Sequence, residues 1–88
     1  MTEMMQKRAE ALKVLAHPDR LKIVKFLSER GKQNVTSIQT VLELPQSTVS
    51  QHLGRLKRSD LLKADRKGLE MYYSIEREYI EQVITGLL

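Results

Sequence analysis

The chain has 88 residues and a formal net charge of +4, with 15 Lys and Arg against 11 Asp and Glu. It contains no cysteine, which excludes disulfides, thiol redox chemistry and cysteine-ligated metal. No apolar run approaches the roughly 18 residues of a membrane-spanning helix, and the N-terminus lacks a signal-peptide pattern, so we expect a cytoplasmic protein with no membrane partner. The length predicts one domain over residues 1–88, with a thin core that favours oligomerisation.

Two helices are predicted at the start of the chain. Apolar side chains recur every three or four residues from Met5 to Ala16, which predicts a helix over residues 3–15. Pro18 suits the first position of a second helix, over residues 18–29. Apolar side chains cover much of the circumference of this second helix, so we expect it to be the most buried one.

A pair of short helices follows in the middle of the chain. After a short extended piece at Asn34–Val35, Thr36 is expected to begin the third helix, with Gln39 as its capping-box partner. Pro45 ends that helix, because proline disfavours helical backbone in the residue before it. A fourth helix is predicted over residues 46–59, and two short helices joined this tightly are typical of a helix-turn-helix.

Beyond the fourth helix the apolar period changes from 3.6 to 2. Residues 61–75 alternate apolar and polar side chains, Leu69 among the apolar ones, and this predicts a β-hairpin. Its turn is the "DRKG" stretch, where Gly68 can adopt a positive φ. A last helix is predicted over residues 76–87, with an apolar arc over about half its circumference. The fold class is therefore mainly α with a small β-hairpin (α+β), in the order α-α-β-α-α-β-β-α.

The fourth helix has an outward face without an acidic residue before Asp60. Its inner stripe is apolar, whereas the outer face carries hydrogen-bonding and cationic side chains at Ser47, Thr48, Gln51, Gly54, Arg55 and Arg58. Such side chains can contact base edges in a DNA major groove: Gln51 suits adenine, and Arg55 suits guanine or a phosphate. A solvated helix that Ser47 merely caps is the alternative that this face alone leaves open.

Three stretches together resemble a known family: "LKVLAHPDRLKIVKFL" (12–27), "LPQSTVSQHLGRLKRSDLL" (44–62) and "RKGLEMYYSI" (66–75). The chain resembles the ArsR/SmtB family of dimeric bacterial transcriptional repressors, and within it the PagR-type members, which lack cysteine ligands. The resemblance implies a winged helix-turn-helix whose terminal helices form a homodimer. It also implies a repressor that binds double-stranded DNA at an imperfect inverted repeat in promoters, through helix 46–58 and the wing 61–75.

Candidate DNA-contacting residues lie at the starts of the third and fourth helices, along the fourth helix and at the wing tip: Thr36, Ser37, Gln46, Ser47, Thr48, Ser50, Gln51, Arg55, Arg66 and Lys67. For the wing tip, an ordinary solvated turn is the alternative. The wide apolar arcs of the terminal helices predict a dimer contact through Met5, Leu12, Tyr79, Ile80, Val83, Ile84 and Leu87. A monomer that uses both arcs internally is the alternative there.

Neither catalysis nor a cofactor is expected. His52 and Ser50 lie two residues apart, so they do not face each other on a helix, and no acid is placed to orient the imidazole. His17 is expected to be an ordinary residue before the proline of a helix start.

No metal is expected either, and the effector stays open. The metal ligands of metal-sensing family members are cysteines on the third helix or histidine and acid pairs on the last, and neither set occurs here. Two alternatives to a DNA-binding repressor of this type remain: a winged-helix protein-interaction module, and a metal-responsive repressor with a ligand site elsewhere.

Overall fold

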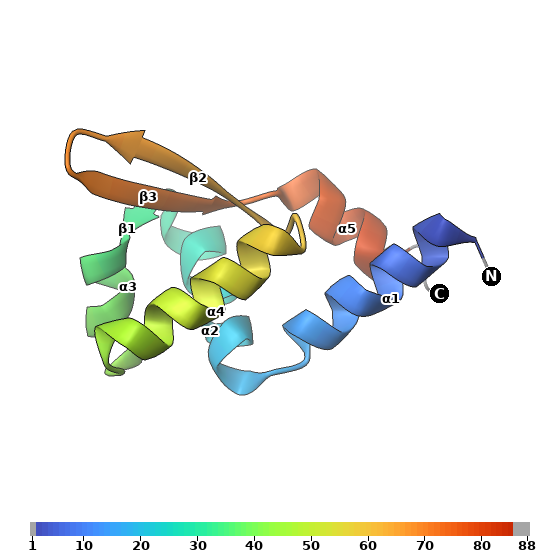
Figure 1. The fold of residues 1–88 in the computed structure, drawn as a ribbon, viewed down its shortest axis with the longest axis horizontal. Helices are drawn as coiled ribbons and strands as arrows, with labels where there is room; N and C mark the ends of the chain where they lie inside the picture. The colour runs from blue at the N-terminus through green and yellow to red at the C-terminus, as the bar shows by residue number, and fades with distance from the viewer. Residues whose placement is uncertain (1, 86–88) are drawn as a thin grey trace.

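Five helices and three short strands follow one another along residues 2–85, the part of the chain that the computed structural model describes (Figure 1). Their bounds are α1 Glu3–Leu15, α2 Pro18–Arg30, β1 Gln33–Asn34, α3 Val35–Leu42, α4 Gln46–Arg58, β2 Leu62–Lys67, β3 Glu70–Ile75 and α5 Arg77–Thr85. The order agrees with the predicted one, and the fold is mainly α with a small sheet. α1 and α5 lie at one end of the molecule, and α3 with the hairpin lies at the other.

Capping side chains set the starts of α1, α2 and α3. Thr2 caps α1 by accepting from the Met5 N–H at 3.1 Å. Pro18 occupies the first turn of α2, as predicted, and His17 caps that helix. The prediction for α3 was wrong: the helix begins at Val35 rather than Thr36, and Asn34 is its cap. Asn is as good an N-cap as Ser or Asp, and here it stands in extended backbone at the end of β1.

The sheet is antiparallel, in the order β1-β3-β2. β2 and β3 form the hairpin, with Leu62 opposite Ile75 at the base and Lys67 opposite Glu70 at the tip. The turn therefore consists of Gly68 and Leu69, two residues further on than "DRKG" suggested. Gly68 has φ +63°, which a two-residue hairpin turn needs at its first position.

The register corrects our interpretation of Leu69. We predicted a half-buried strand residue, but Leu69 lies in the turn and is 95% exposed. β1 was expected at Asn34–Val35; it is Gln33–Asn34, and it pairs with β3 at Tyr73 and Tyr72.

One core joins all five helices to the base of the hairpin. Its members are buried apolar side chains: Ala11, Leu15, Ile23, Leu27, Ile38, Val49, Leu53, Leu56, Leu61, Leu62 and Val83. The inner stripe of α4 (Val49, Leu53 and Leu56) is fully buried, as its spacing predicted. Burying each such side chain contributes about 1.5–3 kcal/mol to stability. The core therefore fixes which face of α4 points outward.

The last helix is shorter than predicted within the described residues. α5 begins at Arg77 rather than residue 76, and Leu87 lies outside the part of the chain that the structure describes. None of the described helices is long and apolar enough to cross a membrane.

Candidate nucleic-acid interface

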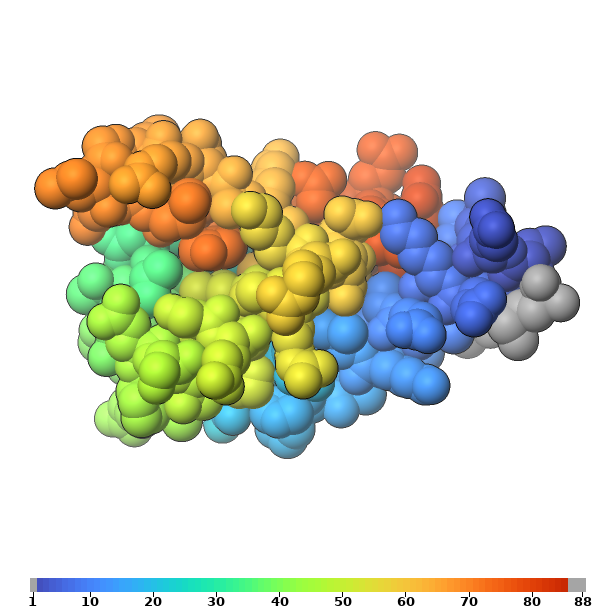
Figure 2. All heavy atoms as spheres, viewed as in Figure 1, coloured from blue at the N-terminus to red at the C-terminus, as the bar shows by residue number. Residues whose placement is uncertain are grey.

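The outer side of α4 lies on the surface of the molecule. Figure 2 shows α4, in lime to yellow, running across the middle of the visible face. Gln46, Ser47, Ser50, Gln51 and Arg55 are exposed, and Thr48 is half-buried. The helix contains no Asp or Glu. The structure thus places the predicted reading residues on one accessible, acid-free helix.

The N-terminus of α4 has no side-chain cap. Its N-cap is Pro45, and Ser47 lies inside the first turn, where it makes no capping hydrogen bond. This contradicts the alternative in which Ser47 serves as the cap. First-turn N–H groups left without an internal acceptor form a natural site for an anion such as a DNA phosphate.

The last turn of α4 is strongly basic, with Arg55, Lys57 and Arg58. Cations in this position also stabilise the negative end of the helix dipole, so they are not by themselves a sign of DNA binding. Arg58 folds back along the helix over Gly54, where an added Cβ would lie 3.1 Å from Arg58 Nη1. Arg55 stays exposed beside Gln51 on the outer side.

The starts of α3 and α4 share a hollow with the wing. Its volume is about 250 Å³, and its lining comes from all three segments: Asn34, Val35, Thr36, Gln46, Leu69, Glu70 and Met71. Thr36 is exposed here, whereas Ser37 is half-buried and its backbone N–H already donates to Asn34. Of the two α3 candidates, Thr36 is therefore the better placed for a phosphate.

The wing tip carries two exposed cations and one exposed apolar side chain. Arg66 Nε donates to the Gly68 carbonyl at 3.2 Å, and Lys67 Nζ lies 5.8 Å from the centre of the Tyr72 ring. Leu69 lies in the turn with almost all of its surface in solvent. Sequence reasoning missed Leu69 because its alternation with Met71 suggested a strand; the preceding glycine was the signal for a turn.

Acidic side chains near this surface are held by internal donors. Asp65 pairs with Lys32 at 2.9 Å, and this hydrogen bond and charge lower the pKa of the Asp65 carboxyl. Glu70 accepts from Asn34 Nδ2 at 3.3 Å and from the Tyr72 hydroxyl at 2.9 Å. The hydrogen bond to Glu70 and its charge raise the pKa of Tyr72 in turn. The charge of both carboxylates is thus partly compensated at this surface.

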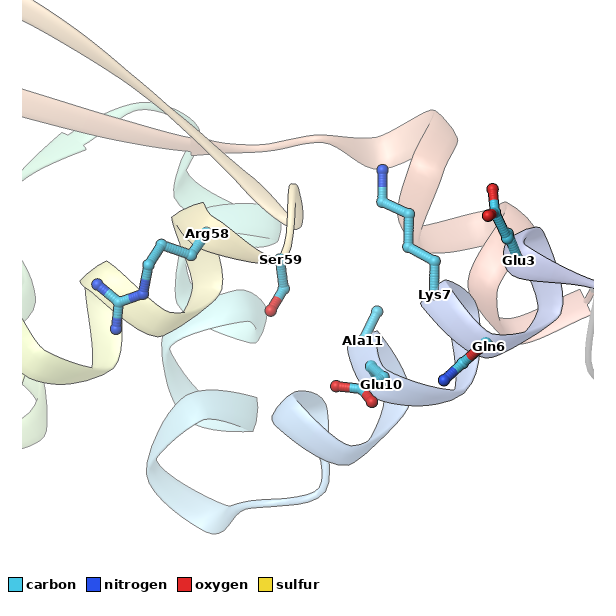
Figure 3. Close-up of a pocket in the computed structure, with 7 residues that line it drawn as sticks. All are labelled: Glu3, Gln6, Lys7, Glu10, Ala11, Arg58 and Ser59. Atoms are coloured by element: carbon cyan, nitrogen blue, oxygen red, sulfur yellow. The ribbon is translucent and has the colours of Figure 1, made fainter.

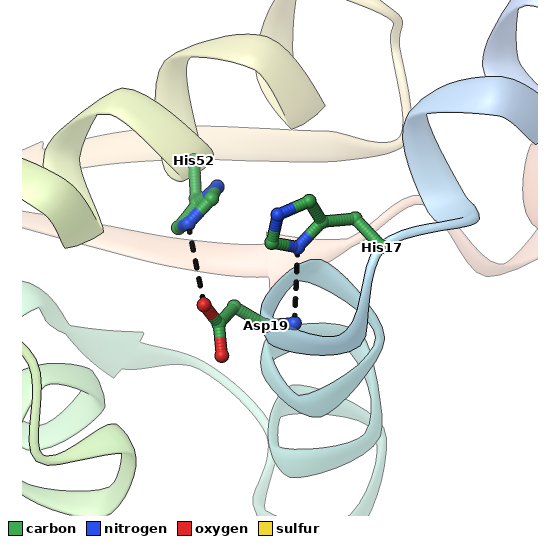
Figure 4. A group of neighbouring side chains, drawn as sticks. All are labelled: His17, Asp19 and His52. Atoms are coloured by element: carbon green, nitrogen blue, oxygen red, sulfur yellow. Dashed lines mark hydrogen bonds and ion pairs between the residues drawn. The ribbon is translucent and has the colours of Figure 1, made fainter.

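Behind α4, two histidines and an aspartate form a cluster that links the α1–α2 connection to α4 (Figure 4). The rings of His17 and His52 lie 4.8 Å apart between centroids. His17 Nδ1 accepts from the Asp19 N–H at 3.1 Å, and His52 Nε2 lies 3.7 Å from Asp19 Oδ2. Arg20 reaches His52 Nδ1 at 3.4 Å and also bonds the Val14 carbonyl.

The hydrogen bonds of this cluster do not suit a metal ion. A histidine that binds metal through Nε2 carries a proton on Nδ1, and that proton needs an acceptor. Here both Nδ1 atoms face donors: the Asp19 N–H for His17 and the Arg20 guanidinium for His52. The Arg20 charge would also repel a cation. The cluster therefore braces α4 from behind.

The surroundings of His52 keep its ring neutral. Burial lowers the pKa of His52 below the usual 6.5, and the neighbouring His17 and Arg20 lower it further. Asp19 acts in the opposite direction but is outweighed. At neutral pH, the contact between His52 and Asp19 is therefore not an ion pair.

A second hollow, of about 390 Å³, lies between α1 and the C-terminal end of α4 (Figure 3). Arg58 and Ser59 line one side, and residues of α1, including Glu3, Lys7 and Glu10, line the other. Charges of both signs surround it, so the lining defines no single class of ligand.

The α1 and α5 helices expose apolar side chains at the same end of the molecule. Met5, Leu12 and Ile84 are 42–50% exposed, and Tyr79 and Ile80 are half-buried. Val83 is fully buried in the core, so it has no surface left to offer a partner. Among the described residues, Arg8 Nε and the Tyr79 hydroxyl are buried without a hydrogen-bond partner in this region.

The architecture defines the class of protein. Two short helices joined tightly, the second with a polar outer side, and an antiparallel hairpin beside them form a winged helix-turn-helix. The profile of the family described as "bacterial regulatory protein, arsR family" matches residues 17–64. The chain belongs to this family, as the three stretches of sequence had indicated, and the family is one of transcription regulators rather than enzymes.

Individual relatives agree with this assignment. The chain is 53% identical over 79 residues to the transcriptional repressor PagR of Bacillus anthracis, covering 90% of this chain and 79% of PagR. It superposes on the PagR crystal structure with a TM-score of 0.80 over 97% of both chains. It is also 31% identical to the arsenical resistance operon repressor of Bacillus subtilis strain 168, over 96% of this chain and 80% of that protein.

A solution structure provides a further likeness. A homodimeric winged helix-turn-helix DNA-binding domain from Mycobacterium bovis superposes with a TM-score of 0.82 at 27% identity. The match covers 99% of this chain and 83% of that one.

Proposed function

We propose that the protein is a homodimeric transcriptional repressor that binds an imperfect inverted repeat in promoter DNA and represses by occluding the promoter. The observation that carries this is the common rim formed by the α3 start, the α4 start and the wing tip around one hollow. Thr36 and Gln46 offer exposed hydrogen-bonding side chains at this rim. The wing tip adds the exposed cations Arg66 and Lys67. The Asp65 and Glu70 carboxylates accept hydrogen bonds from Lys32 and Asn34. A cytoplasmic location follows from the need to reach chromosomal DNA.

The reading helix enters the major groove in this proposal. Gln51 hydrogen-bonds an adenine edge, and Arg55 contacts guanine or a phosphate. Gln46, Ser47, Thr48 and Ser50 contact the backbone or base edges near the uncapped start of α4. Because this helix has no acidic side chain, α4 itself sets no repelling charge against these contacts.

The wing lies along the adjacent backbone or minor groove. Arg66 and Lys67 supply the cations there, and Thr36 approaches a phosphate from the start of α3. Leu69 is an additional contact that we propose from its exposure: an apolar side chain at the tip of a wing can lie against sugars in the minor groove.

The second protomer docks on the exposed apolar side chains of α1 and α5. A homodimeric domain that resembles this chain supports the arrangement. Leu87, which lies outside the described residues, belongs to the same predicted contact. A twofold dimer then requires a twofold DNA site, with half-site centres about 34–36 Å apart.

No metal or cofactor enters this proposal, because the three-residue His and Asp cluster presents donors where metal-bound histidines need acceptors. The effector, if there is one, stays open.

The proposal is tested by selecting genomic fragments that bind the purified protein and then measuring affinity for the enriched sequence and a scrambled duplex across a salt series. We expect enrichment of an inverted repeat, and affinity that falls with salt by about 0.9 log units per log unit for each phosphate contact. Equal, weak affinity for both duplexes at every salt concentration would instead favour a protein-interaction module.

A further inference from the structure

The side chain of Asn34 joins the helix-turn-helix to the wing. Asn34 is both the last residue of β1 and the N-cap of α3. Its Oδ1 accepts from the Ser37 N–H at 2.9 Å, and its Nδ2 donates to Glu70 Oε1 at 3.3 Å. One amide group thus holds the start of α3 at one atom and the tip-side end of β3 at the other.

Glu70 also links this contact to the side chain of Tyr72. Glu70 Oε2 accepts from the Tyr72 hydroxyl at 2.9 Å, and Tyr72 lies opposite Asn34 in the β1–β3 pairing. Lys67, across the hairpin from Glu70, places its Nζ over the Tyr72 ring. Asn34, Glu70, Tyr72 and Lys67 therefore form a continuous connection from the α3 cap to the wing tip.

The wing needs such a connection because little else holds its outer half. β1 has only two residues, and its pairing with β3 ends at Tyr72, before the hairpin's last two residue pairs. Among the described residues, the other ion pair or side-chain hydrogen bond from the helical body to the outer strands is the exposed Lys32–Asp65 pair. The direction of the tip relative to α4 thus depends on a few polar contacts.

We propose that Asn34 is a positioning residue that sets the wing against the reading helix, so that the wing tip and α4 meet the DNA at a fixed spacing. This inference rests on the proposed DNA contact of the wing. Asparagine suits both tasks because one side chain offers an acceptor and a donor. Exchanging the two amide atoms would place a donor against the Ser37 N–H and an oxygen against the Glu70 carboxylate, so a single orientation is favoured.

Other good N-cap residues meet only one of the two requirements. Serine and aspartate cap a helix about as well as asparagine does. Serine, however, lacks the amide that reaches Glu70, and aspartate would set a second carboxylate against it. This separates the two roles experimentally, because the cap can be kept while the wing contact is removed.

The test uses four full-length variants: Asn34→Ser, Asn34→Asp, Glu70→Gln, and the double variant Asn34→Asp with Glu70→Gln. The double variant restores the wild-type net charge and reverses the hydrogen bond, because the new amide at position 70 donates to the new carboxylate at position 34. Glu70→Gln alone is the matched control, since its amide oxygen still accepts from Asn34 while the negative charge is removed.

Measurements without and with DNA distinguish the Asn34–Glu70 contact from the DNA contact of the wing. Without DNA, NMR relaxation and amide shifts of residues 66–71 report the wing, and urea unfolding reports the cap. With DNA, hydroxyl-radical footprinting of the selected operator reports the contact between the wing and the DNA, and titration reports operator affinity.

We expect Asn34→Ser to keep the urea midpoint, to raise wing mobility, and to lower operator affinity by about fivefold, the equivalent of one net hydrogen bond. The footprint outside the major-groove contacts should fade with it. Asn34→Asp should lower operator affinity further. The double variant should restore the affinity to within about twofold of the wild type. Glu70→Gln should raise wing mobility less than Asn34→Ser does, because its amide oxygen still accepts from Asn34 although one acceptor for the Tyr72 hydroxyl is replaced.

Wing signals in Asn34→Ser and Asn34→Asp that match the wild type would overturn the inference, whatever the DNA data show. If Asn34→Ser also weakens the helix cap, the inference is tested by comparing Asn34→Asp with the double variant, because both carry the same cap. Equal wing signals and equal operator affinity in those two variants would also overturn the inference. A mobile wing with unchanged affinity and footprint would instead contradict the wing contact in the proposed function. The role of α4 is tested independently of either result by Gln51→Ala, which we expect to lower operator affinity.

Discussion

At the scale of single residues, the proposed function gives side chains on the outer side of α4 two roles, contact with a base edge and contact with a phosphate. Gln51 is our candidate for reading a base. Replacing Gln51 with alanine should lower operator affinity by about 5- to 150-fold, the equivalent of about 1–3 kcal/mol, and relax preference at one base position in each half-site. The measurement is affinity for a set of single-base operator variants. Equal losses on operator and scrambled duplexes would show that Gln51 contacts only the backbone.

For Arg55, the salt dependence of DNA binding by an alanine variant distinguishes a phosphate contact from a base contact. If Arg55 holds a phosphate, Arg55→Ala weakens binding to all sequences nearly uniformly and lowers the salt slope by about one unit per half-site. If it reads guanine, the loss is specific to the operator. The same salt series on Arg66→Ala and Lys67→Ala should give the uniform result, because both side chains lie at the wing tip. An unchanged affinity and salt slope in all three variants would leave these cations without a role in binding.

His52 makes folding sensitive to pH from behind the reading helix. Its pKa in the folded protein lies below 6.5, so the unfolded chain takes up the proton more readily than the folded one. The stabilisation is therefore fully present above the folded and unfolded pKa values and is lost as the pH falls below about 6.5. We expect the free energy of unfolding from urea titrations to fall between pH 7.5 and pH 5. His52→Gln should show a shallower fall, and an identical pH profile in both proteins would contradict this account.

At the scale of elements, the periodic patterns of the sequence predicted all five helices and the hairpin. Core-facing side chains such as Val49, Leu53 and Leu56 must repeat with the period of their helix, so burial leaves a local signal. Errors occurred where local patterns compete. Thr36 and Asn34 both suit a cap, and Leu69 continues an alternation that the Gly68 turn interrupts.

Contacts between distant segments had no local signal. The Asn34–Glu70 bond joins residues 36 positions apart, and the His52–Arg20 contact joins residues 32 apart. Each partner has an ordinary local explanation, so neither contact could be predicted before the fold was known. Five of the six predicted DNA-contacting residues of α4 are exposed and Thr48 is half-buried, because they follow from the outer face of a correctly predicted helix.

Gly54 is an exception to helix propensity within α4. Glycine inside a helix is less favourable than alanine by about 0.5–1 kcal/mol, and the nearest atoms to an added Cβ belong to the flexible end of Arg58. We expect Gly54→Ala to raise the free energy of unfolding by about that amount, measured at a fixed protein concentration. A destabilised variant would show that Arg58 cannot move aside. If operator affinity falls although stability rises, Gly54 also serves the close approach of DNA.

At the scale of the whole molecule, the proposed dimer places two reading helices on one DNA site. Leu12→Asp and Ile84→Asp introduce charge at exposed apolar positions of α1 and α5, so they should dissociate the dimer and leave the protomer folded. Val83→Asp is the contrasting variant: its side chain is buried in the core, so a charge there should unfold the protomer itself. Sedimentation and circular dichroism distinguish the two results. A wild-type monomer at micromolar concentration would contradict the dimer.

The most direct test of the central claim is the affinity of a variant in which Ser47, Gln51 and Arg55 are all replaced by alanine, measured on the selected operator and on a scrambled duplex. These side chains are exposed and make no contribution to the core, so the variant should stay folded and dimeric. We predict that its preference for the operator disappears and only weak, salt-dependent binding remains. Operator affinity equal to that of the wild type, in a folded and dimeric variant, would show that α4 does not read the DNA.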